Sequence, residues 1–196
     1  MKLKLWTQMS LLRLFDIFFS LTLLLILFPV FLIISLCILI EGPTIFYISN
    51  RVGKNGVIFK MYKFRSMKPL SKKKLKDSER LYKFGIFLRR TSLDELPQLL
   101  NVLIGQMSLV GPRSLPVEIE KNIPKKYLNF RRSIKPGITG LSQINYSGKK
   151  RSLLKKIVLD IKYIKNISIF NYFKILFITF FVILKRYKNN KKGLSL

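Results

Sequence analysis

The sequence predicts a mixed α+β, mostly helical protein, in which an N-terminal re-entrant membrane helix hairpin precedes a small membrane-associated domain with amphipathic interfacial helices. Residues 17–40 form an unbroken run of 24 uncharged residues. Strand and turn patterns follow from residue 44 onwards. Apolar residues make up 49% of a chain that also carries 37 Lys and Arg, so the two kinds of residue are segregated. We expect the hairpin at residues 1–41, the domain at residues 42–184 and a basic tail at residues 185–196.

The apolar run at residues 17–40 is long enough to enter a membrane. As one helix it would reach about 36 Å, against a hydrocarbon core of roughly 30 Å. Pro29 lies near its centre, where proline removes a helical hydrogen bond and bends the axis. Basic residues flank the run on both sides, which favours keeping both ends in the cytoplasm. A re-entrant helix that breaks at Pro29 satisfies both signals; a Pro-kinked span and a cleaved signal peptide are the alternatives.

The remaining elements follow from local patterns. Short strands are expected at residues 44–48 and 57–64 around a turn at residues 53–56, and then a polar loop at residues 68–80. One helix is predicted to start at Ser92, and an amphipathic helix is predicted over residues 153–165. Lys174 interrupts the apolar block at residues 167–184 and leaves ten uncharged residues, too few to span a membrane. That block is either an interfacial helix with a basic tail on anionic lipid or a core helix of the domain.

Composition excludes several kinds of chemistry. The chain has no His, which rules out Ser-His and Cys-His nucleophiles, a His general base and His-containing zinc sites. The net charge of +28 favours polyanionic partners such as anionic lipid or phosphorylated substrates, although AT-biased coding also enriches Lys. No nucleic-acid partner is expected, because the basic residues are spread out and match no known binding motif. The lone Cys37 lies in the apolar run and fits a reducing compartment.

Asp94 and Glu95 are the adjacent acidic pair within an apolar, ordered-looking segment. Ser92 and Glu95 have the spacing of a capping box, which would explain one carboxylate structurally. Alternatively, Asp94 in the first turn of a helix would stay ionised and could attack phosphorus, with Arg89, Arg90 and a divalent metal offsetting the repulsion. Glu95 could bind that metal or carry a proton. The pattern leaves both interpretations open.

Short motifs spread over nearly the whole chain point to one family. They are RLFD at residues 13–16, Pro29, Gly42-Pro43, RVG at residues 51–53, FKMYKFRSM at residues 59–67, LRRTSLDELPQ at residues 88–98, NVL at residues 101–103, MSLVGPR at residues 107–113 and PGITG at residues 136–140. Together they resemble the small monotopic phosphoglycosyl transferases, the bacterial sugar transferases that begin lipid-linked glycan assembly.

The resemblance implies a catalytic domain on the cytoplasmic face of the bacterial inner membrane. The implied reaction transfers a sugar 1-phosphate from a UDP-sugar to polyprenyl phosphate, usually undecaprenyl phosphate, and releases UMP with Mg²⁺ as cofactor. Asp94 would be the nucleophile that forms a covalent phosphosugar intermediate, and Glu95 would serve metal binding and catalysis. Glu95 and Asp94 are the expected metal ligands. Lys63 and Arg113 suit phosphate oxygens. Anionic lipid and downstream glycosyltransferases are further partners that the resemblance allows.

The chain departs from the family pattern at several positions. Phe28 replaces the usual Ser before Pro29, Gln106 replaces an Asp, and Ser114 replaces a Pro. Lys135 replaces the Arg before PGITG. Where the family usually continues Gly-Arg after residues 143–145, Lys149 or Lys150 is expected to replace that Arg at the donor phosphate, as a less directional point charge. With Arg89, Arg90 and Arg113, Lys135 and Lys149 complete the expected substrate-binding set. A catalytically weakened relative that binds glycan-assembly partners at the membrane is the alternative.

Overall fold

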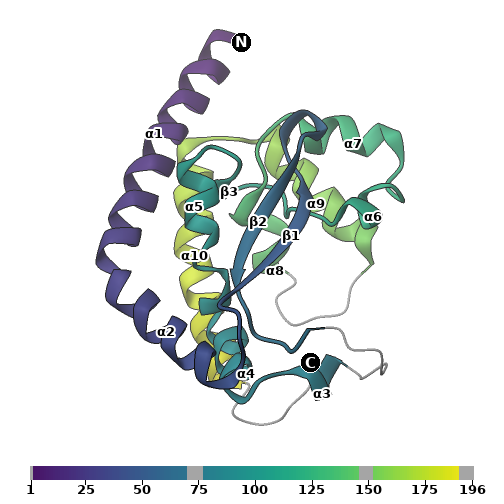
Figure 1. Ribbon diagram of the computed structural model, residues 1–196. Helices are drawn as coiled ribbons and strands as arrows, with labels where there is room; N and C mark the ends of the chain where they lie inside the picture. The colour runs from purple at the N-terminus through teal and green to yellow at the C-terminus, as the bar shows by residue number, and fades with distance from the viewer. Residues whose placement is uncertain (1, 70–76, 146–151, 190–196) are drawn as a thin grey trace.

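The computed structural model describes residues 2–69, 77–145 and 152–189. In this part of the chain the mostly helical α+β class is confirmed: helices surround two small two-stranded sheets. Figure 1 shows the two N-terminal helices along one side, a long β-hairpin across the molecule and the remaining helices around it.

The N-terminal apolar segment forms two helices, α1 (Lys2–Ile26) and α2 (Phe28–Glu41), that meet at an angle (Figure 1). Pro29 lies in the first turn of α2, where its missing N–H costs least. The predicted break at Pro29 is therefore confirmed. By length and composition, one helix of the described chain, Thr7–Ile26, could cross a membrane, and α2 is a shorter apolar helix.

The predicted strand–turn–strand unit is confirmed, with shifted bounds. β1 (Phe46–Val52) and β2 (Ile58–Phe64) pair antiparallel, from Phe46 opposite Phe64 to Val52 opposite Ile58. The 3₁₀ turn η1 (Lys54–Gly56) joins them, with Asn55 and Gly56 at φ values of 57° and 79°. Asn and Gly are the residues that tolerate this left-handed conformation, so the turn type follows from the sequence.

A second sheet joins two of the sequence motifs. β3 (Ser108–Val110) and β4 (Gly137–Thr139) pair in parallel, with Ser108 opposite Gly137 and Val110 opposite Thr139. Gly111 and Gly137 pack backbone against backbone: a Cβ added at Gly137 would lie 2.0 Å from the Gly111 nitrogen. Only glycine fits there, and this approach places the Gly-Pro-Arg loop against PGITG.

The helical elements differ from the predictions in two places: at Ser92, and at residues 77–80, where a short helix lies within the expected polar loop at residues 68–80. The expected helix at residues 153–165 is α9 (Leu153–Lys165), as predicted. The helix predicted to start at Ser92 is wrong, because Ser92 ends one helix and a 3₁₀ turn intervenes before the next. The remaining elements are α3 (Asp77–Arg80), α4 (Lys83–Thr91), η2 (Leu93–Glu95), α5 (Gln98–Leu103), α6 (Val117–Glu120), α7 (Lys125–Arg132), α8 (Leu141–Asn145) and α10 (Ile169–Asn189).

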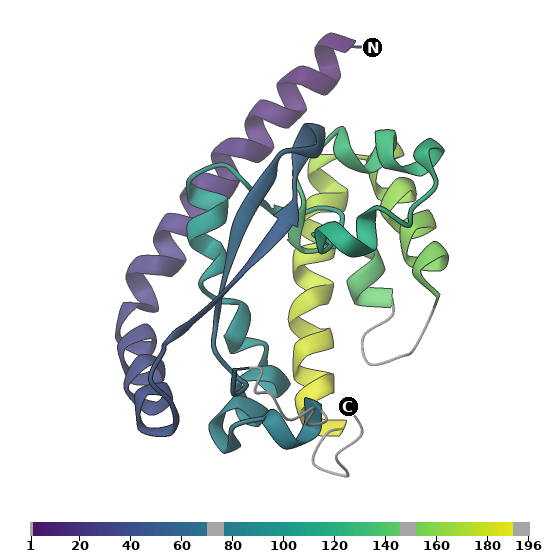
Figure 2. The same cartoon turned by 45° about the vertical axis from the view of Figure 1, so that its right-hand side comes forward.

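The main core lies between α1, α5, α10, β2 and β3. Val102, Met107 and Tyr172 are fully buried in it, and Leu12 and Phe19 of α1 pack against the same cluster. The last apolar block thus lies in α10, and one face of this helix packs in the core. α10 passes through the middle of the molecule in Figure 2. Its other face leaves several phenylalanines exposed: Phe170, Phe177, Phe180 and Phe181.

Polar contacts fix α1 to the domain. Arg13 donates to the carbonyl oxygens of Val102 and Leu103 at 2.6 and 2.9 Å, at the end of α5. Asp16 Oδ1 accepts hydrogen bonds from the Leu109 N–H at 2.8 Å and from Tyr172 Oη at 2.7 Å. Farther along, Ile34 and Ile38 of α2 pack in a second buried cluster with Phe64 and Leu88. Both N-terminal helices therefore lie against one domain.

Candidate active site

A tight turn between α4 and α5 carries the acidic pair. Ser92 ends α4 with φ 60° and ψ 17°, and the backbone N–H of Glu95 donates to the Ser92 carbonyl oxygen at 3.1 Å. The predicted capping box is wrong, because the Ser92 side chain makes no capping hydrogen bond and its backbone is left-handed. Pro97 then leads into the six-residue α5. Asp94 is therefore held in a 3₁₀ turn rather than in the first turn of a long helix.

Glu95 pairs with a cation from the β-hairpin. Lys63 Nζ lies 2.5 Å from Glu95 Oε1, and both side chains are largely buried. Burial raises the pKa of Glu95, but the attraction of Lys63 and Arg113 outweighs burial and leaves that pKa below its usual value. Glu95 is therefore ionised at neutral pH, with one oxygen engaged by Lys63.

The pKa of Asp94 is shifted in the opposite direction to that of Glu95. Asp94 is 9% exposed. Burial raises its pKa to about 6, and the neighbouring charge of Glu95 adds to the rise, while Lys63 and Arg89 oppose it. Two adjacent carboxylates thus have pKa values pushed apart by their environments, an arrangement typical of sites where two acids have different roles. Asp94 is the more basic of the pair.

Further cations surround the pair. The positive charge of Arg113 lowers the pKa of Glu95, and that of Arg89 lowers the pKa of Asp94. Arg186 of α10 lowers the pKa of both carboxyl groups. Arg89 is oriented by its hydrogen bond from Nε to Ser66 Oγ at 2.9 Å. Arg51 of β1 is a neighbour of Arg113 and Glu95; burial and Arg113 lower its pKa. Cations outnumber carboxylates here, which makes the site attractive to a group with several negative charges.

The predicted site residues divide into three groups. Asp94, Glu95, Lys63, Arg89 and Arg113 are brought together as described above. Arg90 is half-buried in the last turn of α4. Lys135 lies at the far end of α5, where its Nζ and the Arg13 guanidinium both face Gly105, so the structure does not bring it to the acidic pair. Lys149 lies outside the described residues.

Gln106, which departs from the family pattern, has a structural role. Asn101 Nδ2 donates to Gln106 Oε1 at 2.7 Å and to the Lys60 carbonyl oxygen at 2.8 Å, while Asn101 Oδ1 accepts from the Tyr62 N–H. These bonds tie α5 to β2 at Lys60 and Tyr62, three residues and one residue before Lys63. Gln106 still supplies an acceptor to that bridge, away from the acidic pair.

Sequence reasoning did not select Arg51 or Arg186 as site residues. Arg51 stands at the start of the RVG motif, which was a usable signal. Arg186 belongs to the basic stretch that the sequence predicts to bind anionic lipid, and only the course of α10 reveals its proximity to Asp94. The long separation along the chain hides this contact from local patterns.

The donor set of the site suits a hard cation. Among the described residues no cluster of three or more His, Cys, Asp and Glu side chains is present, so Asp94 and Glu95 are the available carboxylate ligands. Mg²⁺ usually takes one or two carboxylates and fills its other positions with waters and substrate phosphates. The pair therefore fits Mg²⁺ bound together with a phosphorylated substrate.

Fold and site together define a small α+β protein with apolar N-terminal helices and a cation-rich acidic pair suited to phosphoryl chemistry. A sequence model described as bacterial sugar transferase matches residues 7–186. The chain belongs to the bacterial sugar transferase family.

Several curated relatives support the assignment. The chain is 41% identical to the UDP-glucose:undecaprenyl-phosphate glucose-1-phosphate transferase of Escherichia coli (strain K12), over 85% of this chain and 38% of that protein. It is 43% identical to the galactosyl transferase CpsE of Streptococcus agalactiae, over 73% of this chain and 35% of that protein. It is 37% identical to the exopolysaccharide production protein PSS of Rhizobium leguminosarum, over 84% of this chain and 90% of that protein. The chain thus spans under two-fifths of the first two relatives.

Proposed function

We propose that this protein transfers a sugar 1-phosphate from a UDP-sugar to polyprenyl phosphate at a membrane, through a covalent intermediate on Asp94. The names of the Escherichia coli and Streptococcus relatives support a sugar transferase, and the first of them specifies undecaprenyl phosphate as acceptor. The observation that carries the proposal is the division of roles in the acidic pair: Glu95 is engaged by Lys63, whereas Asp94 has a raised pKa.

The nucleophile is assigned by basicity and by freedom of the oxygens. A carboxylate with a pKa of about 6 is largely ionised at neutral pH and more basic than an ordinary aspartate. An Asp94 oxygen attacks the phosphorus that bears the sugar, the bond from that phosphorus to the bridging oxygen breaks, and UMP leaves with the electron pair. An oxygen of polyprenyl phosphate then attacks the same phosphorus and restores the Asp94 carboxylate.

The cations of the site reduce the electrostatic repulsion between the attacking carboxylate and the donor's diphosphate. A carboxylate and a diphosphate repel each other, and the first step concentrates negative charge on the departing UMP. Arg89, Arg113 and Arg186 offset that charge, and guanidinium groups match phosphate oxygens in a bidentate way. Mg²⁺, held by Asp94 and Glu95 before attack, would neutralise phosphate oxygens as a Lewis acid. Lys63 keeps Glu95 ionised and fixed in place.

A membrane location follows from the apolar surface. Large side chains of α1 and α2 are exposed along both helices, including Leu25 at 70% and Ile40 at 85%. Exposed patches of this extent are typical of membrane or protein contacts. Because the domain packs against α1 from Leu12 to Leu24 and against Ile34 and Ile38 of α2, we favour a re-entrant pair of helices over a span. The reaction then takes place on the cytoplasmic face, where a soluble donor meets a lipid acceptor.

The direct test is UMP release by purified protein in detergent or nanodiscs with undecaprenyl phosphate, Mg²⁺ and a panel of UDP-sugars. Wild type should release UMP with at least one donor, and without acceptor its intact mass should rise by one sugar phosphate. Asp94→Asn should abolish both signals, with a loss of at least about 10³-fold. Glu118→Gln is the matched control, since Glu118 is exposed and should keep the rate within about twofold. Failure of every donor would instead favour a catalytically weakened relative.

A further inference from the structure

The backbone of Arg113 is bonded to one member of a buried ion pair. Arg131 Nη2 donates to the Arg113 carbonyl oxygen at 2.6 Å. The Arg113 backbone also lowers the pKa of the Asp160 carboxyl group. Arg131 and Asp160 in turn pair with each other, with Arg131 Nε 3.3 Å from Asp160 Oδ2. The carbonyl oxygen of Arg113 is therefore bonded to one member of the pair, and the other member is sensitive to the same stretch of backbone.

Three helices converge to make this arrangement. Arg131 comes from α7, Asp160 from α9, and Ser142 of α8 donates to Asp160 Oδ1 at 2.6 Å. The side chains of Arg131 and Asp160 are 5% and 3% exposed. Burial lowers the pKa of Arg131 and raises that of Asp160, so each group depends on its partner to stay charged. Burying two charges this deep is energetically costly, and an apolar pair of similar volume is often equally stable. A contribution to stability therefore does not by itself explain why the chain has a buried ion pair at this position.

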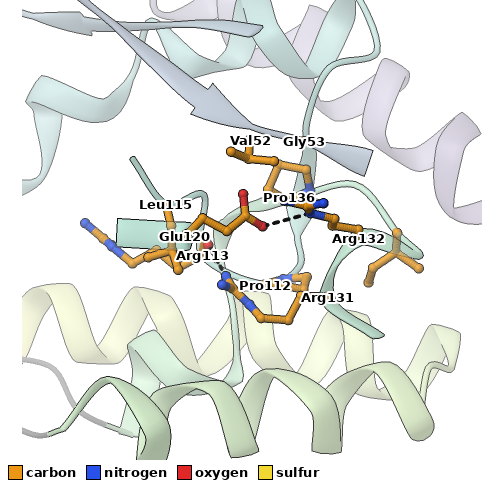
Figure 3. Close-up of a pocket in the computed structure, with 10 residues that line it drawn as sticks. Val52, Gly53, Pro112, Arg113, Leu115, Glu120, Arg131, Arg132 and Pro136 are labelled. Atoms are coloured by element: carbon orange, nitrogen blue, oxygen red, sulfur yellow. Dashed lines mark hydrogen bonds and ion pairs between the residues drawn. The ribbon is translucent and has the colours of Figure 1, made fainter. Parts of the chain in front are cut away.

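The pair cannot contact a substrate directly. The cavity beside it is lined by Arg113, Arg131 and Glu120 among other residues, and its volume of about 10 Å³ is that of a single water (Figure 3). In the same view the end of the Arg113 side chain points away from Arg131 and Arg132. That side chain is exposed and acts on Glu95. Any effect of the pair on the reaction must therefore pass through Arg113.

We propose that the buried Arg131–Asp160 pair, supported by Ser142, is a positioning device that fixes Arg113 for binding the donor's phosphates. This inference rests on the proposed function. A guanidinium binds phosphate well only when its fork faces the oxygens, so a mobile backbone at Arg113 would weaken that contact. Hydrogen bonds from Gly137 N–H to the Pro112 carbonyl oxygen and from Gly111 N–H to that of Thr139, both 2.9 Å, pin the preceding residues. The ion pair completes this fixation at Arg113 itself.

The test is a double-mutant cycle on UDP binding, measured by calorimetry on the purified full chain in nanodiscs. Arg131→Lys keeps a positive charge against Asp160 but cannot hold Asp160 and the Arg113 carbonyl oxygen together. We expect UDP affinity to fall about tenfold, as for one charge-assisted hydrogen bond, and the KM for the UDP-sugar to rise similarly. In an Arg113→Gln background the same substitution should have no further effect. Ser142→Ala, a milder change that keeps both charges, should weaken UDP binding two- to threefold.

The matched control is Arg132→Gln, the next residue of α7. Arg132 Nε pairs with the buried Glu120 at 3.3 Å without a hydrogen bond to Arg113, so this variant should lower the unfolding temperature and leave UDP affinity unchanged. The inference is overturned if Arg131→Lys weakens UDP binding no more than Arg132→Gln does, or weakens it equally when Arg113 is absent. Wild type that neither binds UDP nor releases UMP would overturn the proposed function and the inference with it.

Discussion

At the scale of single residues, one contact connects the β1–β2 hairpin to the acidic pair. Lys63 Nζ touches Glu95 Oε1 and also opposes the raised pKa of Asp94. Lys63→Met removes this cation and leaves a largely buried carboxylate without its partner. We expect UMP release to fall by about 10²- to 10³-fold, because charge stabilisation and the orientation of Glu95 are lost together.

The control for Lys63→Met lies on the same strand. Lys60 is exposed on β2, and its backbone oxygen rather than its side chain bonds Asn101. Lys60→Met should therefore keep UMP release within about twofold. Equal losses in the two variants would mean that the rate depends on general positive charge and not on the contact with Glu95.

Asp160 gives the protein a pH-dependent stability. Burial raises its pKa from 3.8 to about 6, against the lowering effects of Arg131 and Ser142. The folded carboxyl therefore binds its proton more tightly than the unfolded one, and its contribution to stability falls as pH rises from about 4 to 6. Asp160→Asn has no proton to lose. Its unfolding temperature relative to wild type should be less unfavourable at pH 7 than at pH 4.5.

Thermal unfolding at the two pH values, followed by circular dichroism, checks this. Glu118→Gln, an exposed carboxylate, should show the same difference from wild type at both pH values. A pH-independent gap between Asp160→Asn and wild type would show that Asp160 is already ionised throughout this range.

At the scale of elements, the β3–β4 pair depends on close packing of two glycines. A Cβ at Gly137 would lie 2.0 Å from the Gly111 nitrogen and 2.4 Å from the Thr139 oxygen, both backbone atoms that cannot give way. Gly137→Ala should destabilise the protein by about 3 kcal/mol, since the strands must separate. Gly53→Ala, whose Cβ meets Phe59 and Val57 at 3.2 Å, should cost clearly less. Comparable thermal shifts for the two variants would refute this.

Elements with a local signal could be predicted from the sequence. The β-hairpin of β1 and β2, the break at Pro29 and the bounds of α9 follow from turn residues, proline and periodicity, and the structure confirms them. The turn at Ser92 could not be predicted, because the Ser-x-x-Glu spacing of a capping box is also present in a chain that passes through a left-handed residue and a 3₁₀ turn. α4 is not predicted for the same reason: the Ser-x-x-Glu spacing indicates the start of a helix at Ser92, where α4 in fact ends.

The acidic pair, Lys63, Arg89 and Arg113 can be predicted from sequence motifs, whereas Arg186 and the residues that support Arg113 cannot. Arg186 reaches the pair because α10 crosses the whole domain, and Arg113 is fixed by residues 18 and 47 positions further along the chain. Lys135 was expected near substrate from its place before PGITG. Its neighbours Arg13 and Asp16 belong to α1, a contact that no local pattern indicates.

At the scale of the whole molecule, the domain's contacts with α1 and α2 restrict the membrane topology. Arg13 and Asp16 are bonded to α5, β3 and α10, and Ile38, near the end of α2, packs against Phe64 and Leu88 of the same domain. A spanning α1 would carry these polar anchors into the bilayer or place α2 on the opposite side, away from β2 and α4. Both ends of the helix pair should therefore face the same aqueous side.

Site-directed cysteine labelling tests this topology in the full chain. Cys37→Ser provides the background, and Lys2→Cys and Asn50→Cys provide one probe before and one after the helix pair. A membrane-impermeant maleimide should label both probes in inverted inner-membrane vesicles and neither in intact spheroplasts. Pro29→Ala restores the missing helical N–H and favours a straighter helix, so part of the Lys2→Cys population should become reactive from outside. Labelling of position 2 only from outside, with Pro29 present, would show that α1 spans the membrane and would rule out the re-entrant arrangement.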